Sequence, residues 1–289
     1  MNPKQTARYV KRRILRQLDL AYARVATWIP ERFPDFMCIG APRAATTWLH
    51  KQLSPHPQVF LPRRKEIHFY DESRDDGMPD RADLRWRESF YFDVARPGHL
   101  RWYWHQFRGA GDRLAGDITP LYSTLSQARI RQIHAQIPAL RIIYILRNPV
   151  ERAWSGLRKS VWYQKGSDYL GSMPDDWLLR QVTHPDVLLR GDYPQAIVNW
   201  ESVFPAERFL YLFHDDVESD SEAVLRQVCG FLGIAAPAGS AGAGRTGRVN
   251  AAPASEMPEL VREALRRHYR PQIRILEARF QRDLSHWLR

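Results

Sequence analysis

The fold is decided by the stretch Phe36-Met37-Cys38-Ile39-Gly40-Ala41-Pro42-Arg43-Ala44-Ala45-Thr46-Thr47-Trp48-Leu49. An apolar run leads into a loop of small residues, and an amphipathic segment follows, so the pattern predicts a strand, a tight loop and a helix. A helix N-terminus presents unpaired N–H groups and the positive end of the helix dipole, which together bind anions. Arg43 adds a positive charge, and Thr46 and Thr47 add hydroxyl donors. We therefore expect this loop to hold a phosphate or sulfate group.

A second turn of the same kind follows the apolar run 141–146, which predicts a buried strand. Arg147 ends that strand, and Asn148 and Pro149 have the residue types of an N-cap and a first helical position. The helix is expected to run from about 149 to 163 and to carry Ser155. Arginine presents a planar fork to phosphate oxygens. The start of the helix adds N–H donors, so this turn is a second candidate site for a phosphate.

The rest of the chain alternates between the two kinds of element. Further extended runs are expected at 58–61, 117–118 and 209–213, and helices at 125–136 and after a Ser219–Glu222 capping box. Two C-terminal helices are expected, separated at Pro271. The alternation predicts an α/β fold with a mostly parallel central sheet flanked by helices. We expect a basic, helical N-terminal segment (1–34) and one domain (35–289).

Composition narrows the class of protein without deciding its function. The 289 residues are 44% hydrophobic, enough for a full core. Neither a run of 18 apolar residues nor a signal pattern is present, so a cytoplasmic location is expected. Cys38 and Cys229 have the settings of buried thiols, without zinc-ligand spacing. The net charge of +11 is compatible with a polyanion, an anionic membrane beside the basic N-terminal helix, or a charged nucleotide.

The first loop resembles the 5′-phosphosulfate loop of sulfotransferases that use 3′-phosphoadenosine-5′-phosphosulfate, whose pattern is Pro-Lys/Arg-x-Gly-Thr-Thr-x-Leu. A loop of the ATPase type would instead end in Gly-Lys-Ser/Thr. Ala45 departs from the family's glycine, and its Cβ disfavours a positive φ. The resemblance implies that the cofactor is bound by these residues of the loop and helix: Arg43, Ala44, Ala45, Thr46, Thr47 and Trp48. Trp48 is implied to stack on the adenine, although a core role is its alternative.

The second turn is similar to the 3′-phosphate site of the same family, in which Arg and Ser lie eight positions apart, as Arg147 and Ser155 do. Near the C-terminus, Gly247 and Arg248 resemble a Lys/Arg-Gly-Arg element that closes over the cofactor. A solvated basic loop is the alternative for these last two residues.

A third match is to the heparan-type glycan sulfotransferases. The segment 65–71 (Lys-Glu-Ile-His-Phe-Tyr-Asp) is similar to their Glu-x-His-Phe-Phe-Asp. It implies that Glu66 is the catalytic base for the acceptor and that His68 assists it. The alternatives are a surface carboxylate and a core histidine. The segment 117–122 resembles their Glu-Lys-Thr-Pro-x-Tyr, but Ile118 replaces the lysine that contacts the acceptor.

Together these resemblances imply a sulfotransferase with a P-loop-like fold. It would move a sulfuryl group to an acceptor hydroxyl by in-line displacement and release adenosine 3′,5′-bisphosphate, with no metal required. Arg43 would act by its charge, since arginine stays protonated. The expected acceptor is a glycan or a glycan-bearing small molecule. The aromatic stretch 86–107 offers rings on which sugars can stack, although aromatic side chains more often belong to a core. A tyrosyl-protein or lipid acceptor, or a non-catalytic polyanion-binding protein, is the alternative. Nucleic acid is not an expected partner.

Overall fold

Five strands form the centre of the fold, all parallel, in the order β2-β3-β1-β4-β5. Their bounds are β1 Phe36–Gly40, β2 Val59–Phe60, β3 Leu114–Ile118, β4 Arg141–Leu146 and β5 Phe209–Phe213. The computed structural model describes residues 18, 20–23, 25–71, 92–165, 170–236 and 255–289, and all statements below concern these residues. The sheet confirms the predicted α/β class.

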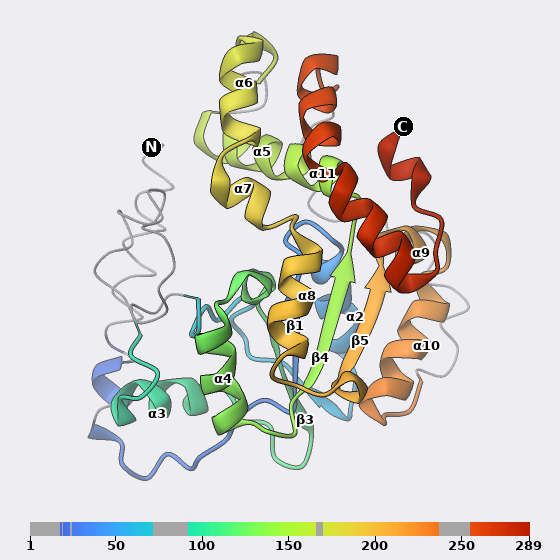
Figure 1. Cartoon of the computed structure of the whole chain (residues 1–289). Helices are drawn as coiled ribbons and strands as arrows, with labels where there is room; N and C mark the ends of the chain where they lie inside the picture. The colour runs from blue at the N-terminus through green and yellow to red at the C-terminus, as the bar shows by residue number, and fades with distance from the viewer. Residues whose placement is uncertain (1–17, 19, 24, 72–91, 166–169, 237–254) are drawn as a thin grey trace.

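Helices cover both faces of this sheet. Figure 1 shows α4 and α8 in front of the strands and α2 behind them. The α-helices are α2 Thr46–Leu53, α3 Pro97–Gln106, α4 Gln127–Gln136, α5 Pro149–Lys165, α6 Asp175–Val182, α7 Pro185–Leu189, α8 Tyr193–Glu201, α9 His214–Ser219, α10 Ser221–Leu232 and α11 Glu259–Phe280. The short 3₁₀ helices are η2 Pro120–Thr124, η3 Leu170–Ser172, η4 Ala206–Arg208 and η5 Ser285–Leu288. None of the described helices combines the length and the apolar character that crossing a membrane needs.

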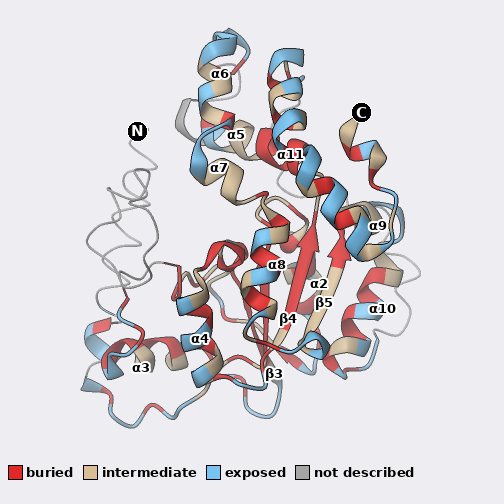
Figure 2. Ribbon diagram, in the orientation of Figure 1, coloured by how far each residue is buried: buried red, intermediate tan, exposed pale blue. Residues whose placement is uncertain are grey.

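The central strands are buried on both faces, and Figure 2 shows β4 almost entirely in the buried colour. Continuous apolar runs such as 141–146 are typical of such strands, because helices cover both sides of a parallel sheet. Packing across β1 and β3 is tight: a Cβ on Gly116 would lie 2.2 Å from the ring of Phe36. The predicted buried thiols, Cys38 and Cys229, are both confirmed.

The strand order changes direction at β1, which has β3 on one side and β4 on the other. In open parallel sheets, ligands bind beyond the carboxyl ends of the strands at such a switch point. The loop after β1, the end of β3 and Arg147 after β4 all lie at this edge. The fold therefore brings the separate motifs of the sequence to one place.

Two local expectations are wrong. The predicted Ser219–Glu222 capping box is not formed, because Asp220 is the N-cap of α10 and its carboxylate accepts the N–H of Ala223 at 2.9 Å. Ser219 donates instead to the carbonyl of Asp216. A carboxylate one residue later is an equally good acceptor for the first turn, so the serine is not needed.

The C-terminal helix is not divided at Pro271, because α11 is continuous from Glu259 to Phe280. Its buried face continues across the proline through Val261, Leu265, Tyr269, Ile273 and Leu276. A proline inside a helix costs about 3 kcal/mol, whereas each fully buried apolar side chain contributes about 1.5–3 kcal/mol. The free energy gained by burying this apolar face outweighs the cost of the proline. Figure 1 shows α11 bending rather than ending.

Candidate active site

The loop after β1 holds two non-glycine residues in the left-handed region, Arg43 at φ 72° and Ala45 at φ 59°. The chain passes close to its neighbours here, since a Cβ on Gly40 would lie 2.8 Å from Tyr144 and 2.9 Å from Ser123. Helix α2 begins directly after Ala45, which gives its first turn no side-chain cap. The N–H groups and positive dipole end of α2 therefore point toward this edge of the sheet without a capping side chain.

The two anion-binding turns predicted from the sequence meet at this edge. Arg147 donates from Nη1 to the carbonyl oxygen of Arg43 at 2.7 Å. Arg43 in turn donates from Nε to Oγ of Ser155 at 3.0 Å. One continuous set of contacts thus joins the loop after β1, the end of β4 and the second turn of α5.

The start of α5 fixes the position of Arg147. Asn148 is the predicted cap, since its Oδ1 accepts the N–H of Val150 at 3.0 Å. The hydroxyl of Tyr193 donates to the carbonyl of Arg147 at 2.8 Å. Burial lowers the pKa of the Arg147 guanidinium, against the opposing charges of Glu151 and Glu218. Arginine nevertheless stays charged, so Arg147 is a half-buried, oriented cation.

Glu66 and His68 lie in a segment, 61–71, that is neither helix nor strand. The carboxylate of Glu66 accepts from Nζ of Lys65 at 2.7 Å and lies 3.6 Å from Nε2 of His68. The other ring nitrogen of His68 is 2.8 Å from the buried carboxylate of Asp71. The imidazole is therefore placed between two carboxylates, with a fixed orientation.

The electrostatic balance at Glu66 favours its ionised form. Burial alone raises the pKa of this carboxyl, but the neighbouring His68 ring and the charge of Lys65 outweigh burial. The net result is a pKa well below the usual range of a glutamate. Glu66 is thus a carboxylate throughout the neutral range, available to accept a proton.

Lys159 belongs to the site but was missed in the sequence. Burial lowers its pKa, and so does the charge of Arg43, whereas Glu66 raises it. The loop and the 65–71 segment therefore act electrostatically on the same lysine. A signal was present, because Lys159 follows Ser155 by four residues and so lies on the same face of the helix.

Several side chains that the sequence analysis considered for ligand contacts lie in the core. Trp48 is 6% exposed and packs in the main hydrophobic cluster, which leaves little of its ring free for stacking. Ile118, at the position of the family lysine, is buried as well. In the aromatic stretch, the buried side chains are Phe92, Trp102, Tyr103 and Phe107. For these four, the core role is confirmed, because their rings pack on one another and on Phe69.

Two other predictions fall outside the described residues. They are the cofactor contacts of Gly247 and Arg248 and most of the basic N-terminal helix.

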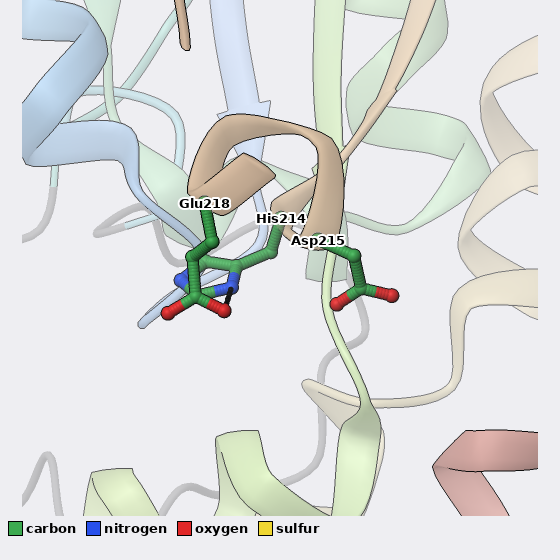
Figure 3. A group of neighbouring side chains, drawn as sticks. All are labelled: His214, Asp215 and Glu218. Atoms are coloured by element: carbon green, nitrogen blue, oxygen red, sulfur yellow. Dashed lines mark ion pairs between the residues drawn. The ribbon is translucent and has the colours of Figure 1, made fainter. Parts of the chain in front are cut away.

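A cluster of potential metal ligands, His214, Asp215 and Glu218, lies at the start of α9. Figure 3 shows His214 and Glu218 facing one another, at 3.3 Å, with the Asp215 carboxylate on the other side. Oδ2 of Asp215 accepts from Trp287 at 2.8 Å and contacts His286 at 2.9 Å. We assign Asp215 to docking of the C-terminal segment, whose Trp287 carbonyl also accepts from Asn148.

Comparisons with known proteins agree with this geometry. The model of the sulfotransferase family matches residues 34–238. Heparan sulfate glucosamine 3-O-sulfotransferase 6 of Mus musculus is 29% identical over 209 residues, which are 70% of this chain and 53% of that protein. Carbohydrate sulfotransferase 15 of Homo sapiens is 27% identical over 70% of this chain and 44% of its own length. The chain thus spans about half the length of the curated relatives it matches.

A solved structure gives the same result over nearly the whole chain. The sulfotransferase from Alicyclobacillus acidocaldarius superposes with a TM-score of 0.65 and 25% identity, covering 89% of this chain and 100% of that one. Sulfotransferase STF9 from Mycobacterium avium, at 13% identity and a TM-score of 0.54, shares the fold.

Proposed function

The chain belongs to the sulfotransferase family, and we propose that it transfers a sulfuryl group from 3′-phosphoadenosine-5′-phosphosulfate to a hydroxyl of a glycan or glycan-bearing acceptor. The observation that carries this proposal is the pair of contacts Arg147–Arg43 and Arg43–Ser155, at 2.7 and 3.0 Å. Two anion-binding turns in direct contact suit one nucleotide with phosphate groups at both ends.

The residues at this edge fit such a donor because they offer hydrogen-bond donors and positive charge. We assign the 5′ side to Arg43 and the uncapped start of α2, with Thr46 and Thr47. The 3′-phosphate is assigned to Arg147 and Ser155. When bound, the donor supplies the sulfuryl group and leaves as adenosine 3′,5′-bisphosphate.

We assign Glu66 as the base that accepts the proton of the acceptor hydroxyl. Its low pKa keeps it ionised, and Lys65 and His68 hold its two oxygens in place. The interactions that lower its pKa also weaken it as a base. Negative charge brought to this edge offsets them and raises the proton affinity of Glu66. In this assignment Glu66 takes the proton of the acceptor hydroxyl, and a different residue faces the negative charge that develops during transfer.

Arg43 is assigned to the negative charge that develops during transfer. Its guanidinium does not release a proton, so it acts as a fixed charge oriented by Ser155. Arg43→Lys should therefore retain more activity than Arg43→Ala. Equal losses in the two variants would show that the geometry of the fork, rather than the charge, is what matters.

The relatives with glycan names and the net charge of +11 favour an acidic glycan as the acceptor. A tyrosyl peptide and a lipid alcohol are the other acceptors to be compared. The test is mass spectrometry of each acceptor after incubation with enzyme and donor, with the gain of one sulfate as the expected product.

A binding experiment separates this proposal from a non-catalytic polyanion-binding protein. Adenosine 3′,5′-bisphosphate at 100 times its Kd should stabilise the fold by about 2.7 kcal/mol. AMP lacks the 3′-phosphate and should stabilise it far less at the same concentration. Equal shifts with both nucleotides, together with no sulfated product, would reject the proposed function.

A further inference from the structure

A buried carboxylate lies beneath the segment that carries Glu66 and His68. Asp117, near the end of β3, is fully buried. Its Oδ2 accepts hydrogen bonds from the hydroxyls of Tyr103 at 2.9 Å and Tyr122 at 3.0 Å. Its Oδ1 accepts from the hydroxyl of Thr119 at 2.7 Å. Three hydroxyl donors thus converge on one carboxylate.

Two of these three hydroxyls also bind the backbone of the 65–71 segment. The N–H of Ile67 donates to Oγ1 of Thr119 at 3.0 Å. The N–H of Phe69 donates to the hydroxyl of Tyr122 at 3.1 Å. A hydroxyl has one proton to give, and Asp117 receives it in both cases, so each oxygen turns its lone pairs to the backbone. Ionised Asp117 therefore fixes the direction of both hydroxyls.

The two bonded residues alternate with the two candidate catalytic residues. Glu66 and His68 both adopt left-handed backbone conformations, at φ 62° and 58°. Such a conformation costs a non-glycine residue roughly 1–2 kcal/mol. It persists only where the surroundings determine the backbone. Here the N–H groups that follow Glu66 and His68 both donate to hydroxyls, and both hydroxyls donate to Asp117.

We propose that Asp117, acting through Thr119 and Tyr122, is the positioning group that sets the backbone of Glu66 and His68 for proton transfer. This inference rests on the proposed function only in its effect on turnover. Asp117 itself does not touch the reacting atoms, because two hydroxyls separate it from the segment. It is buried, and through the two hydroxyls it holds the backbone of the 65–71 segment in one position relative to β3.

Two tyrosines provide a matched pair of variants. Tyr122→Phe and Tyr103→Phe each remove one phenol that donates to Asp117, and each keeps its ring in the aromatic core. Only Tyr122→Phe also removes the acceptor of the Phe69 N–H. We expect Tyr122→Phe to lower kcat roughly 10–100-fold with the KM for the donor unchanged, since small misplacements of reacting groups have such effects. Tyr103→Phe should stay within about threefold of wild type on the same argument.

Thr119 provides a second pair of variants, which distinguishes the loss of its hydroxyl from general damage to the fold. Thr119→Ser keeps the hydroxyl that joins Ile67 to Asp117, whereas Thr119→Val keeps the shape and removes it. The serine variant should retain kcat and the valine variant should lose it. Equal loss in both, or equal kcat in Tyr122→Phe and Tyr103→Phe, would overturn the inference.

Amide hydrogen exchange separates this inference from the proposed function. Tyr122→Phe should accelerate exchange of the Phe69 amide, and Tyr103→Phe should leave it unchanged. If wild type sulfates none of the acceptors but this difference appears, the proposed function fails and the positioning contacts stand. If wild type is active and Tyr122→Phe changes neither exchange nor kcat, the positioning role is wrong.

Discussion

The two ends of the site are held by different means. What we propose as the donor end (43–48 with Arg147 and Ser155) consists of two strand–helix turns whose residues contact each other directly. What we propose as the acceptor end (65–71) has no regular secondary structure and depends on hydroxyls more than fifty residues away in sequence. A turn between a strand and a helix is local and shows in the sequence. The 65–71 segment could be recognised by its resemblance, but the distant side chains that hold it are visible only in the folded protein.

The largest expected effect separates chemistry at the acceptor end from binding at the donor end. Glu66→Gln keeps the size of the side chain and removes the base, so kcat should fall by roughly 10²–10⁴-fold. Stabilisation by adenosine 3′,5′-bisphosphate in a thermal-shift assay should be unchanged. Glu207→Gln, at an exposed position in η4, is the matched control and should keep wild-type turnover. Near-normal kcat in Glu66→Gln would remove Glu66 from the role of base.

The second prediction concerns stability at the acceptor end. Burial raises the pKa of Asp117 to about 6, against three hydroxyl bonds that lower it. Because folding raises the pKa, protonated Asp117 favours the folded state. Its contribution to the free energy of unfolding is complete below the unfolded pKa of 3.8 and is lost as the pH rises through about 6. The ionised group at neutral pH thus makes the fold less stable, by on the order of 3 kcal/mol.

Asp117→Asn removes this titration. Between pH 4 and pH 7, its free energy of unfolding should fall less than that of wild type, by on the order of 3 kcal/mol. Denaturant unfolding at several pH values measures the difference, and a constant offset between the two proteins does not affect it. Parallel pH profiles would show that Asp117 has an ordinary pKa and that its burial does not matter for stability.

The third prediction tests the donor end alone. Arg147→Ala should weaken binding of adenosine 3′,5′-bisphosphate by roughly 10–100-fold, the usual effect of losing a charged hydrogen bond. Binding of AMP should change little, because AMP has no 3′-phosphate. Arg226→Ala, on the exposed face of α10, is the control for the loss of one positive charge. If both nucleotides lose affinity equally, Arg147 supports the loop through Arg43 rather than binding the 3′-phosphate.

The difference between local turns and contacts with distant side chains also explains which features could be predicted from the sequence. The strands 36–40, 141–146 and 209–213 were predicted at nearly their observed bounds, because parallel strands are continuous apolar runs. Arg147 and Ser155 were singled out by the family's Arg–Ser spacing, and the structure brings both into contact with Arg43. Lys159, the role of Asp117 and the hydroxyl contacts to Ile67 and Phe69 were not predicted, since each depends on which distant elements pack together. Pro271 misled the prediction for the same reason: the packing of α11 outweighs the local signal.

The smallest expected effect concerns Ala45, where the family pattern has glycine. Its φ of 59° is unfavourable for alanine, whereas Ala44 beside it is buried and has no such strain. Ala45→Gly relieves the strain and should raise the free energy of unfolding by up to about 1 kcal/mol, after the larger entropy of glycine in the unfolded chain is deducted.

Ala44→Gly is the matched control, because it removes the same methyl group from the next residue. It should lower stability by about 1 kcal/mol, through lost burial and added chain entropy. The two substitutions should therefore have opposite signs in denaturant unfolding. Removing the Cβ of Ala45 also lets an anion approach the loop more closely, so Ala45→Gly should strengthen binding of adenosine 3′,5′-bisphosphate. Destabilisation by both substitutions would mean that the backbone at position 45 is not under strain.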